Sequence, residues 1–213
     1  SILIDRISKC KSFRESAKSK SVNSKASTPY LFGDIRQPEN DYLLVPRVSS
    51  HNRNYLPIGY ISKETILADS AYGLPKATKY QFGILQSLMH NVWIRTVAGK
   101  LKSDYRYSNN LVYNNYPWPK DVSDKNKQSV EEKAQKVLDA RAEYPESSLA
   151  DLYHPLTMPP KLVKAHQELD KAVDLCYRPQ AFTNETARIE YLFDLYNQYT
   201  APLLTSKKIT NKK

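Results

Sequence analysis

The chain has 213 residues, of which 25% are charged and 40% hydrophobic, as in an ordinary globular protein with a core and one or two domains. No apolar run approaches the roughly 18 residues of a membrane-spanning helix, so we expect no membrane partner. The net charge of +10 is uneven: residues 1–120 hold 18 Lys and Arg against 8 Asp and Glu, and the remainder holds 14 of each. A basic half that is also rich in Tyr is typical of proteins that bind the phosphate backbone of nucleic acid.

The first third of the chain predicts a short basic helix over 2–18, a Ser- and Lys-rich loop over 19–29, and strand-like runs between 30 and 68. Pro46 and Pro57 interrupt two of these runs and favour edge strands or bulges. Because the chain does not begin with Met, we expect a piece of a longer polypeptide. The two cysteines, Cys10 and Cys176, are far apart in sequence, and we expect free thiols in a reducing compartment.

The clearest helix is predicted over 78–98, where apolar residues recur at helical spacing. Thr78 is suited to cap its start and Gly99 to end it. His90 falls beside the apolar stripe and is expected at the surface or its boundary. A charged, alternating stretch follows the helix, and 110–119 is strand-like again.

After Pro119 the pattern becomes helical, with amphipathic helices predicted over 127–143, 160–177 and 184–199 and a disordered basic tail at the end. The predicted fold class is therefore α+β. We expect a mixed α/β domain over 1–119, followed by a small all-helical domain over 120–213.

Catalytic motifs are missing from the sequence. The five glycines form no phosphate-binding loop, no Cys and His spacing fits zinc, and the Asn/Asp-Pro-Pro-Tyr/Phe motif of amino-methyltransferases does not occur. We therefore expect no catalytic residue and no metal or cofactor in this segment, so that any catalysis would lie elsewhere in a longer polypeptide or on a partner.

The stretch GKLKSDYRYSNN, residues 99–110, has charges of alternating sign at Lys102, Asp104 and Arg106. Residues two apart in a strand point to one face, so these three side chains are expected side by side. In the DNA major groove, Lys and Arg donate to guanine O6 and N7, whereas Asp accepts from cytosine N4. The pattern therefore suits the reading of a G·C pair, although a surface strand with a local ion pair accounts for it equally well.

Three long segments carry a resemblance to a known family: DYLLVPRVSSHNRNYLPIGY, GILQSLMHNVWIRTVAGKLKSDYRYSNNLVYNNYPWP and QKVLDARAEYPESSLADLYHPLTMPPKLVKAHQELDKAVD. They resemble the C-terminal region of the MmeI-like, or type IIL, restriction-modification proteins and related single-chain DNA adenine methyltransferases. The resemblance implies that residues 1–119 are a target recognition domain that reads duplex DNA. It also implies a parent enzyme, cytoplasmic and prokaryotic, whose methyltransferase domain uses S-adenosylmethionine to methylate adenine N6, in a family whose members also carry a nuclease domain.

The resemblance also implies which residues contact DNA. Base-reading positions fall by local match at Lys102 and Asp104, with Arg106 as a further reader, and near Arg47, Asp69 and Ser70. Basic residues elsewhere are candidates for contacts to phosphates, which orient a protein on DNA without reading sequence. These candidates are Lys9, Lys11, Arg53, Lys76, Lys79, Arg95 and Lys100. The alternative to a DNA reader is a protein–protein docking module whose basic surface is incidental.

Overall fold

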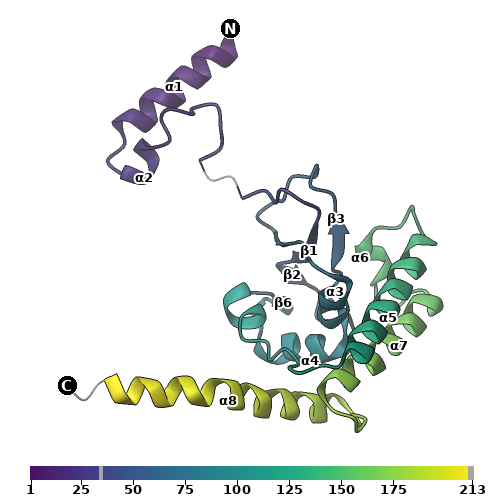
Figure 1. The fold of residues 1–213 in the computed structure, drawn as a ribbon. Helices are drawn as coiled ribbons and strands as arrows, with labels where there is room; N and C mark the ends of the chain where they lie inside the picture. Colours follow the sequence, from purple (N-terminus) through teal and green to yellow (C-terminus); the bar gives the residue numbers. More distant parts are fainter. Residues whose placement is uncertain (34–35, 211–213) are drawn as a thin grey trace. The chain divides into compact units, whose positions relative to one another are not determined.

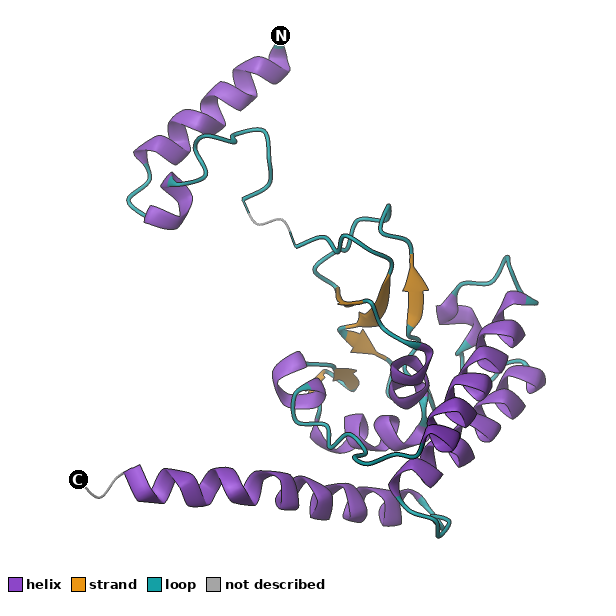
Figure 2. Ribbon diagram, viewed as in Figure 1, coloured by secondary structure: helices purple, strands orange, loops and turns teal. Residues whose placement is uncertain are grey.

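The structure is a computed structural model that describes residues 1–33 and 36–210, with side chains described as far as Ala201. It divides into two compact units, Ser1–Gln37 and Pro38–Lys213. The α+β class is confirmed, since two small sheets and several helices precede residue 120 and the described residues after it form helices without strands (Figures 1 and 2). No helix of the described residues combines the length and apolarity needed to cross a bilayer.

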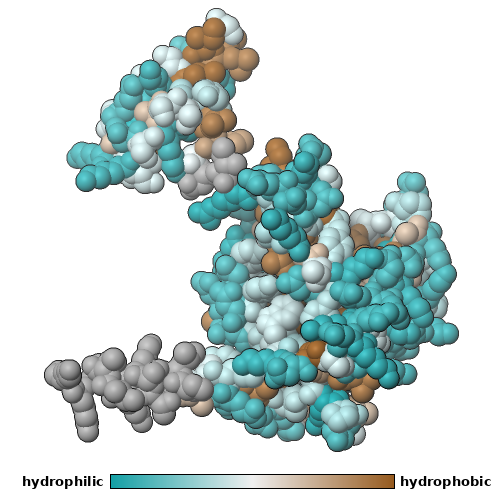
Figure 3. Space-filling view, in the orientation of Figure 1, coloured by the Kyte–Doolittle hydropathy of each residue, from teal (hydrophilic) through white to brown (hydrophobic). Residues whose placement is uncertain are grey.

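The first unit contains α1 (Ile2–Ser16) and the short α2 (Lys20–Asn23), which lies in the stretch predicted to be a loop. Arg14 holds the unit together by donating to the backbone carbonyls of Lys25, Thr28 and Leu31 at 2.8–2.9 Å. None of the residues of α1 is buried, and hydrophobic side chains gather near its start (Figure 3). Residues 30–33 form no strand, contrary to prediction, and residues 34 and 35 lie outside the described residues.

The second unit contains two three-stranded antiparallel sheets. One has the order β3 (Gly59–Ile61), β1 (Tyr42–Pro46) and β4 (Ala71–Pro75), and the other β2 (Val48–Ser49), β6 (Asp104–Arg106) and β5 (Gly99–Leu101). Pro46 does not mark an edge strand, because β1 is the central strand of its sheet and ends at this proline. Pro57 lies outside any strand, and β4 was not predicted.

The helix predicted over 78–98 is two helices, α3 (Lys79–Gln86) and α4 (Leu88–Val97). Ser87 interrupts them with an extended backbone (ψ 162°), and its hydroxyl donates to the carbonyl of Ile84 at 2.7 Å and accepts from the N–H of His90. Serine favours such caps because its hydroxyl competes with the helix for backbone partners. The run predicted to be strand-like over 110–119 instead begins in the short π-helix η1 (Asn109–Tyr113).

His90 was placed wrongly at the surface, because its ring is fully buried. Nδ1 lies 2.7 Å from the carbonyl of Leu85, to which it donates, so Nε2 accepts from the Tyr107 hydroxyl at 3.2 Å. Burial lowers the pKa of His90 to about 4. These contacts explain why a polar residue is tolerated beside the apolar stripe.

We expect His90 to make the fold acid-sensitive. The unfolded chain binds a proton near pH 6.5 and the folded ring does not until about pH 4, so stability falls as pH falls through this window. The stability difference between the wild type and His90→Gln, measured by urea unfolding, should shrink by about 3 kcal/mol from pH 7 to pH 4. Comparing the two proteins removes the contribution of other titrating groups, and a difference that does not change with pH would contradict this assignment.

The helical part comprises α5 (Asp124–Ala142), α6 (Leu149–Leu152), α7 (Pro160–Tyr177) and α8 (Glu185–Thr210). Helix α8 extends beyond its predicted end at 199 into the predicted tail, of which residues 211–213 lie outside the described residues. Helices α3 and α5 approach closely because Gly83 has no side chain: a Cβ there would lie 2.6 Å from Val130. The core of the second unit combines residues from both sides of position 119, and the domain boundary expected there stays a prediction.

Candidate nucleic-acid interface

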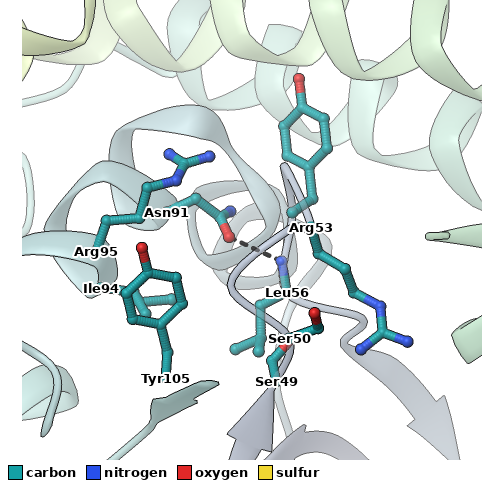
Figure 4. Close-up of a pocket in the computed structure, with 9 residues that line it drawn as sticks. Ser49, Ser50, Arg53, Leu56, Asn91, Ile94, Arg95 and Tyr105 are labelled. Carbon is teal, nitrogen blue, oxygen red and sulfur yellow. Dashed lines mark hydrogen bonds between the residues drawn. The ribbon is translucent and has the colours of Figure 1, made fainter. Parts of the chain in front are cut away.

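The sheet β2-β6-β5 has two unlike faces. Ser49 pairs with Tyr105, and both side chains turn inward, where they line a small hollow with Asn91 and Ile94 of α4 (Figure 4). Ser49 is only 5% exposed. Because side chains alternate along a strand, Asp104 and Arg106 lie on the opposite, outer face of this sheet.

Asp104 and Arg106 are therefore neighbours on one face, as the sequence predicted, but Lys102 does not continue their strand. Lys102 and Ser103 form the turn between β5 and β6, and Lys102 adopts a positive φ of 56°. The strand prediction failed there because neither turn residue is a Gly, Asn or Asp that would signal a hairpin. Lys102 is exposed at the tip of the hairpin, beside the face rather than on it.

The other three predicted base readers come together where β1 passes into β2. The guanidinium of Arg47 donates to the carbonyl of Asp69 at 2.7 Å, and its backbone N–H donates to the carbonyl of Ser70 at 3.0 Å. The carbonyl of Arg47 accepts from the N–H of Tyr107 at 2.8 Å, directly after Arg106. Backbone contacts thus connect the segments around 47, 69–70 and 104–107, although about 60 residues separate the first from the last.

His51 is a residue of this region that the sequence did not point to. Its backbone N–H donates to Asp104 Oδ1 at 3.3 Å, and its ring Nδ1 lies 3.5 Å from the same oxygen. The His51 and Asp104 side chains remain 44% and 41% exposed. The contact limits the orientations of the Asp104 carboxylate. No sequence pattern could have paired two residues that lie 53 positions apart.

The segment that carries His51 is held in place by hydrogen bonds to the helical part and to α4. The Tyr55 hydroxyl donates to Asp170 of α7 at 2.7 Å, and Arg141 of α5 donates to the carbonyl of Ile58 at 2.8 Å. The N–H of Leu56 donates to the Asn91 side chain at 2.7 Å (Figure 4). Asp170 accepts its hydrogen bonds in a buried, low-dielectric setting, and this burial raises its pKa to about 6.

Arg141 is the centre of this buried network. Besides Ile58, it donates to the Gln86 side chain at 3.0 Å and to the Tyr153 hydroxyl. The Tyr153 hydroxyl in turn lies 2.6 Å from Nε2 of His166, whose pKa is held well below its ordinary value by burial and by the charge of Arg141. The helical part therefore fixes the backbone from which the loop of His51 extends.

The predicted phosphate-contacting residues fall into three groups. Lys76, Lys79 and Lys100 are exposed. Arg53 and Arg95 are partly buried and have partners at the surface: Arg53 donates to the carbonyl of Ala150, and Arg95 donates to the carbonyl of Asn54 and to Glu185. Lys9 and Lys11, in the separate first unit, pair with Asp5 and Glu15 of the same helix.

The described residues contain no cluster of three or more His, Cys, Asp or Glu able to hold a metal. Cys10 and Cys176 are free thiols, as predicted, and burial raises the pKa of Cys176 to about 11. The feature that distinguishes this surface is a sheet face with exposed charge whose supporting backbone is fixed by buried hydrogen bonds.

Comparison with known proteins agrees with the resemblance. The family model described as "MmeI, target recognition domain" matches residues 1–120, and that described as "MmeI, C-terminal domain" matches residues 122–204. DNA methyltransferase A of Bacillus subtilis (strain 168) is 42% identical over 199 residues, which is 93% of this chain and 22% of that protein.

A solved structure, that of the type IIL restriction-modification enzyme MmeI in complex with DNA, is 45% identical and superimposes with a TM-score of 0.83. The match covers 94% of this chain and 27% of that one, so the chain spans about a quarter of the length of these relatives. The chain therefore belongs to the MmeI family, and it comprises the family's target recognition domain followed by its C-terminal domain.

Proposed function

We propose that this chain reads the base sequence of duplex DNA on behalf of a longer restriction-modification protein. The observation that carries the proposal is the pair of partly exposed Asp104 and exposed Arg106 on the outer face of β2-β6-β5, in a chain whose first 120 residues match a target recognition domain. The solved relative that this chain resembles is bound to DNA, which supports the same partner here.

The chemistry of the pair suits the major groove. Arg106 can donate two hydrogen bonds to O6 and N7 of a guanine, and the Asp104 carboxylate can accept from a cytosine amino group. Lys102, at the exposed hairpin tip, would add a donor from the side. Arg47, Asp69 and Ser70 would extend the reading surface to neighbouring base pairs, because their backbones adjoin the same strand.

Catalysis belongs, in this proposal, to the rest of the longer protein. Binding of S-adenosylmethionine, adenine-N6 methylation and any DNA cleavage would be carried out there, since these 213 residues hold neither a Gly-rich loop nor the methyltransferase motif. We place that protein in the prokaryotic cytoplasm. The unburied helix α1, with Ile2, Leu3 and Ile4 each about 70% exposed, is the candidate contact with the methyltransferase domain of the same polypeptide.

Salt dependence of binding tests the proposal. Affinity of the 213-residue chain for duplex DNA should fall steeply between about 50 and 200 mM salt, because phosphate contacts release counterions. Lys79→Gln and Lys100→Gln should each weaken binding to all sequences alike by about 3- to 10-fold and reduce the salt slope by about 1.

The matched control is Lys171→Gln, an exposed lysine of α7 in the half of the chain without excess positive charge, which should leave affinity unchanged. Salt-insensitive binding, or an equal loss in the Lys171 variant, would contradict the proposal and favour a docking module. A change of base preference in the Lys100 variant would show that Lys100 reads a base instead.

A further inference from the structure

The outer face of β2-β6-β5 carries apolar side chains as well as charged ones. Val48 is 42% exposed and Leu101 53% exposed, although both are in strands. Ser49 and Tyr105, on the inner face, already pack this sheet against the rest of the second unit. Val48 and Leu101 are therefore not needed for the core and are available to a partner.

The strand register puts each apolar residue beside a charged one. Val48 is directly opposite Arg106, and Leu101 is directly opposite Asp104. Side chains opposite each other in antiparallel strands lie about 4.5–5.5 Å apart at Cβ, so each pair forms one small surface with an apolar and a polar half.

Gly99 leaves part of the outer face of the sheet free of side chains. It is opposite Arg106 on the side away from Val48, and a Cβ there would meet no atom within 4 Å. Its φ is not positive, so the backbone does not require glycine. The missing side chain leaves room for a partner beside Arg106.

We propose that Val48 and Leu101 read the 5-methyl group of thymine in the major groove. This inference rests on the proposed function, and it assigns two further specificity-determining residues to the same face. In the major groove, thymine presents O4 next to an apolar methyl group, whereas cytosine presents an amino group without one. An apolar side chain beside a charged reader matches a groove in which a methyl group adjoins hydrogen-bonding atoms.

Duplex DNA is the occupant that the charges favour. The exposed apolar area is flanked by Asp104 and Arg106 and belongs to the half of the chain that carries the whole excess of positive charge. An apolar protein partner would leave these two charges without the polar atoms that a base edge offers them.

Uracil substitution tests the inference, because uracil differs from thymine only by the missing methyl group. The site that the 213-residue chain selects from randomised duplexes would be resynthesised with each thymine replaced in turn by uracil. We expect affinity to fall about 3- to 10-fold at one or two positions, as for the loss of one or two buried methyl contacts. Val48→Ala or Leu101→Ala should abolish that loss at one position each while preserving preference at G·C pairs.

Leu156→Ala is the matched control, since Leu156 is 88% exposed in the connection between α6 and α7, and it should keep the uracil response. Gly99→Ala should fold normally yet bind the site more weakly, because the added methyl would stand between Arg106 and the base. A selected site without an A·T pair, a wild type insensitive to uracil, or alanine variants that keep its full response would each overturn the inference and leave sequence reading intact. Selection of no site at all would instead overturn the proposed function, and this inference with it.

Discussion

Replacement of Arg141 by alanine is expected to lower the free energy of unfolding by about 3–5 kcal/mol. The change removes the donor for the Ile58 carbonyl, the Gln86 side chain and the Tyr153 hydroxyl, all within the core. Each buried polar group left without a partner costs about 1–3 kcal/mol. Urea unfolding at neutral pH measures the loss.

Glu131→Ala is the control for this experiment, because Glu131 is exposed on the same helix and should change stability by no more than about 0.5 kcal/mol. Arg141→Lys should give an intermediate loss, since one ammonium cannot serve three partners in the same fork-like geometry. An Arg141→Ala variant as stable as Glu131→Ala would mean that water replaces these bonds and that the network does not support the loop of His51.

Asp104→Asn is expected to change which base is bound without weakening the fold. The carboxylate only accepts hydrogen bonds, whereas the amide both donates and accepts and suits adenine N6 and N7. Preference for cytosine at the affected position should drop by about 1–3 kcal/mol, or roughly 5- to 150-fold, with adenine gaining. Competition binding with duplexes that differ at one base pair measures the change.

His51→Ala should reduce the same discrimination less, since it removes the ring contact to Asp104 but keeps the backbone one. Asp124→Asn, at a fully exposed carboxylate at the start of α5, is the control and should leave base preference unchanged. Loss of affinity by Asp104→Asn that is equal for all four bases would show that Asp104 supports the surface but reads nothing.

A helix could be predicted where both its first residue and its apolar stripe were evident from the sequence. Helix α7 occupies its predicted range because Pro160 starts it and an apolar stripe runs its length. The same periodicity misled the prediction at Ser87, since a capping serine breaks a helix without disturbing the spacing of its apolar residues. His90 was misplaced for a related reason, because the partners that satisfy it, Leu85 and Tyr107, are not evident from the pattern.

The sheets and the outer face of β2-β6-β5 were only partly predictable from the sequence. Strands of two to five residues are too short to show alternation, so β4 was missed and the β5–β6 turn was taken for a strand. The adjacency of Asp104 and Arg106 follows from their spacing alone. Their proximity to Arg47 and His51 depends on strand pairing between distant segments, which the order of residues does not reveal.

The most direct measurement is a binding selection of the 213-residue chain from a pool of randomised duplexes at two salt concentrations. We expect enrichment of one short motif that contains a G·C pair, with affinity that falls as salt rises. Salt-sensitive binding without an enriched motif would contradict base reading by the isolated chain and assign it only backbone contacts. The absence of binding at both salt concentrations would contradict the assignment of the outer face of β2-β6-β5 to DNA altogether.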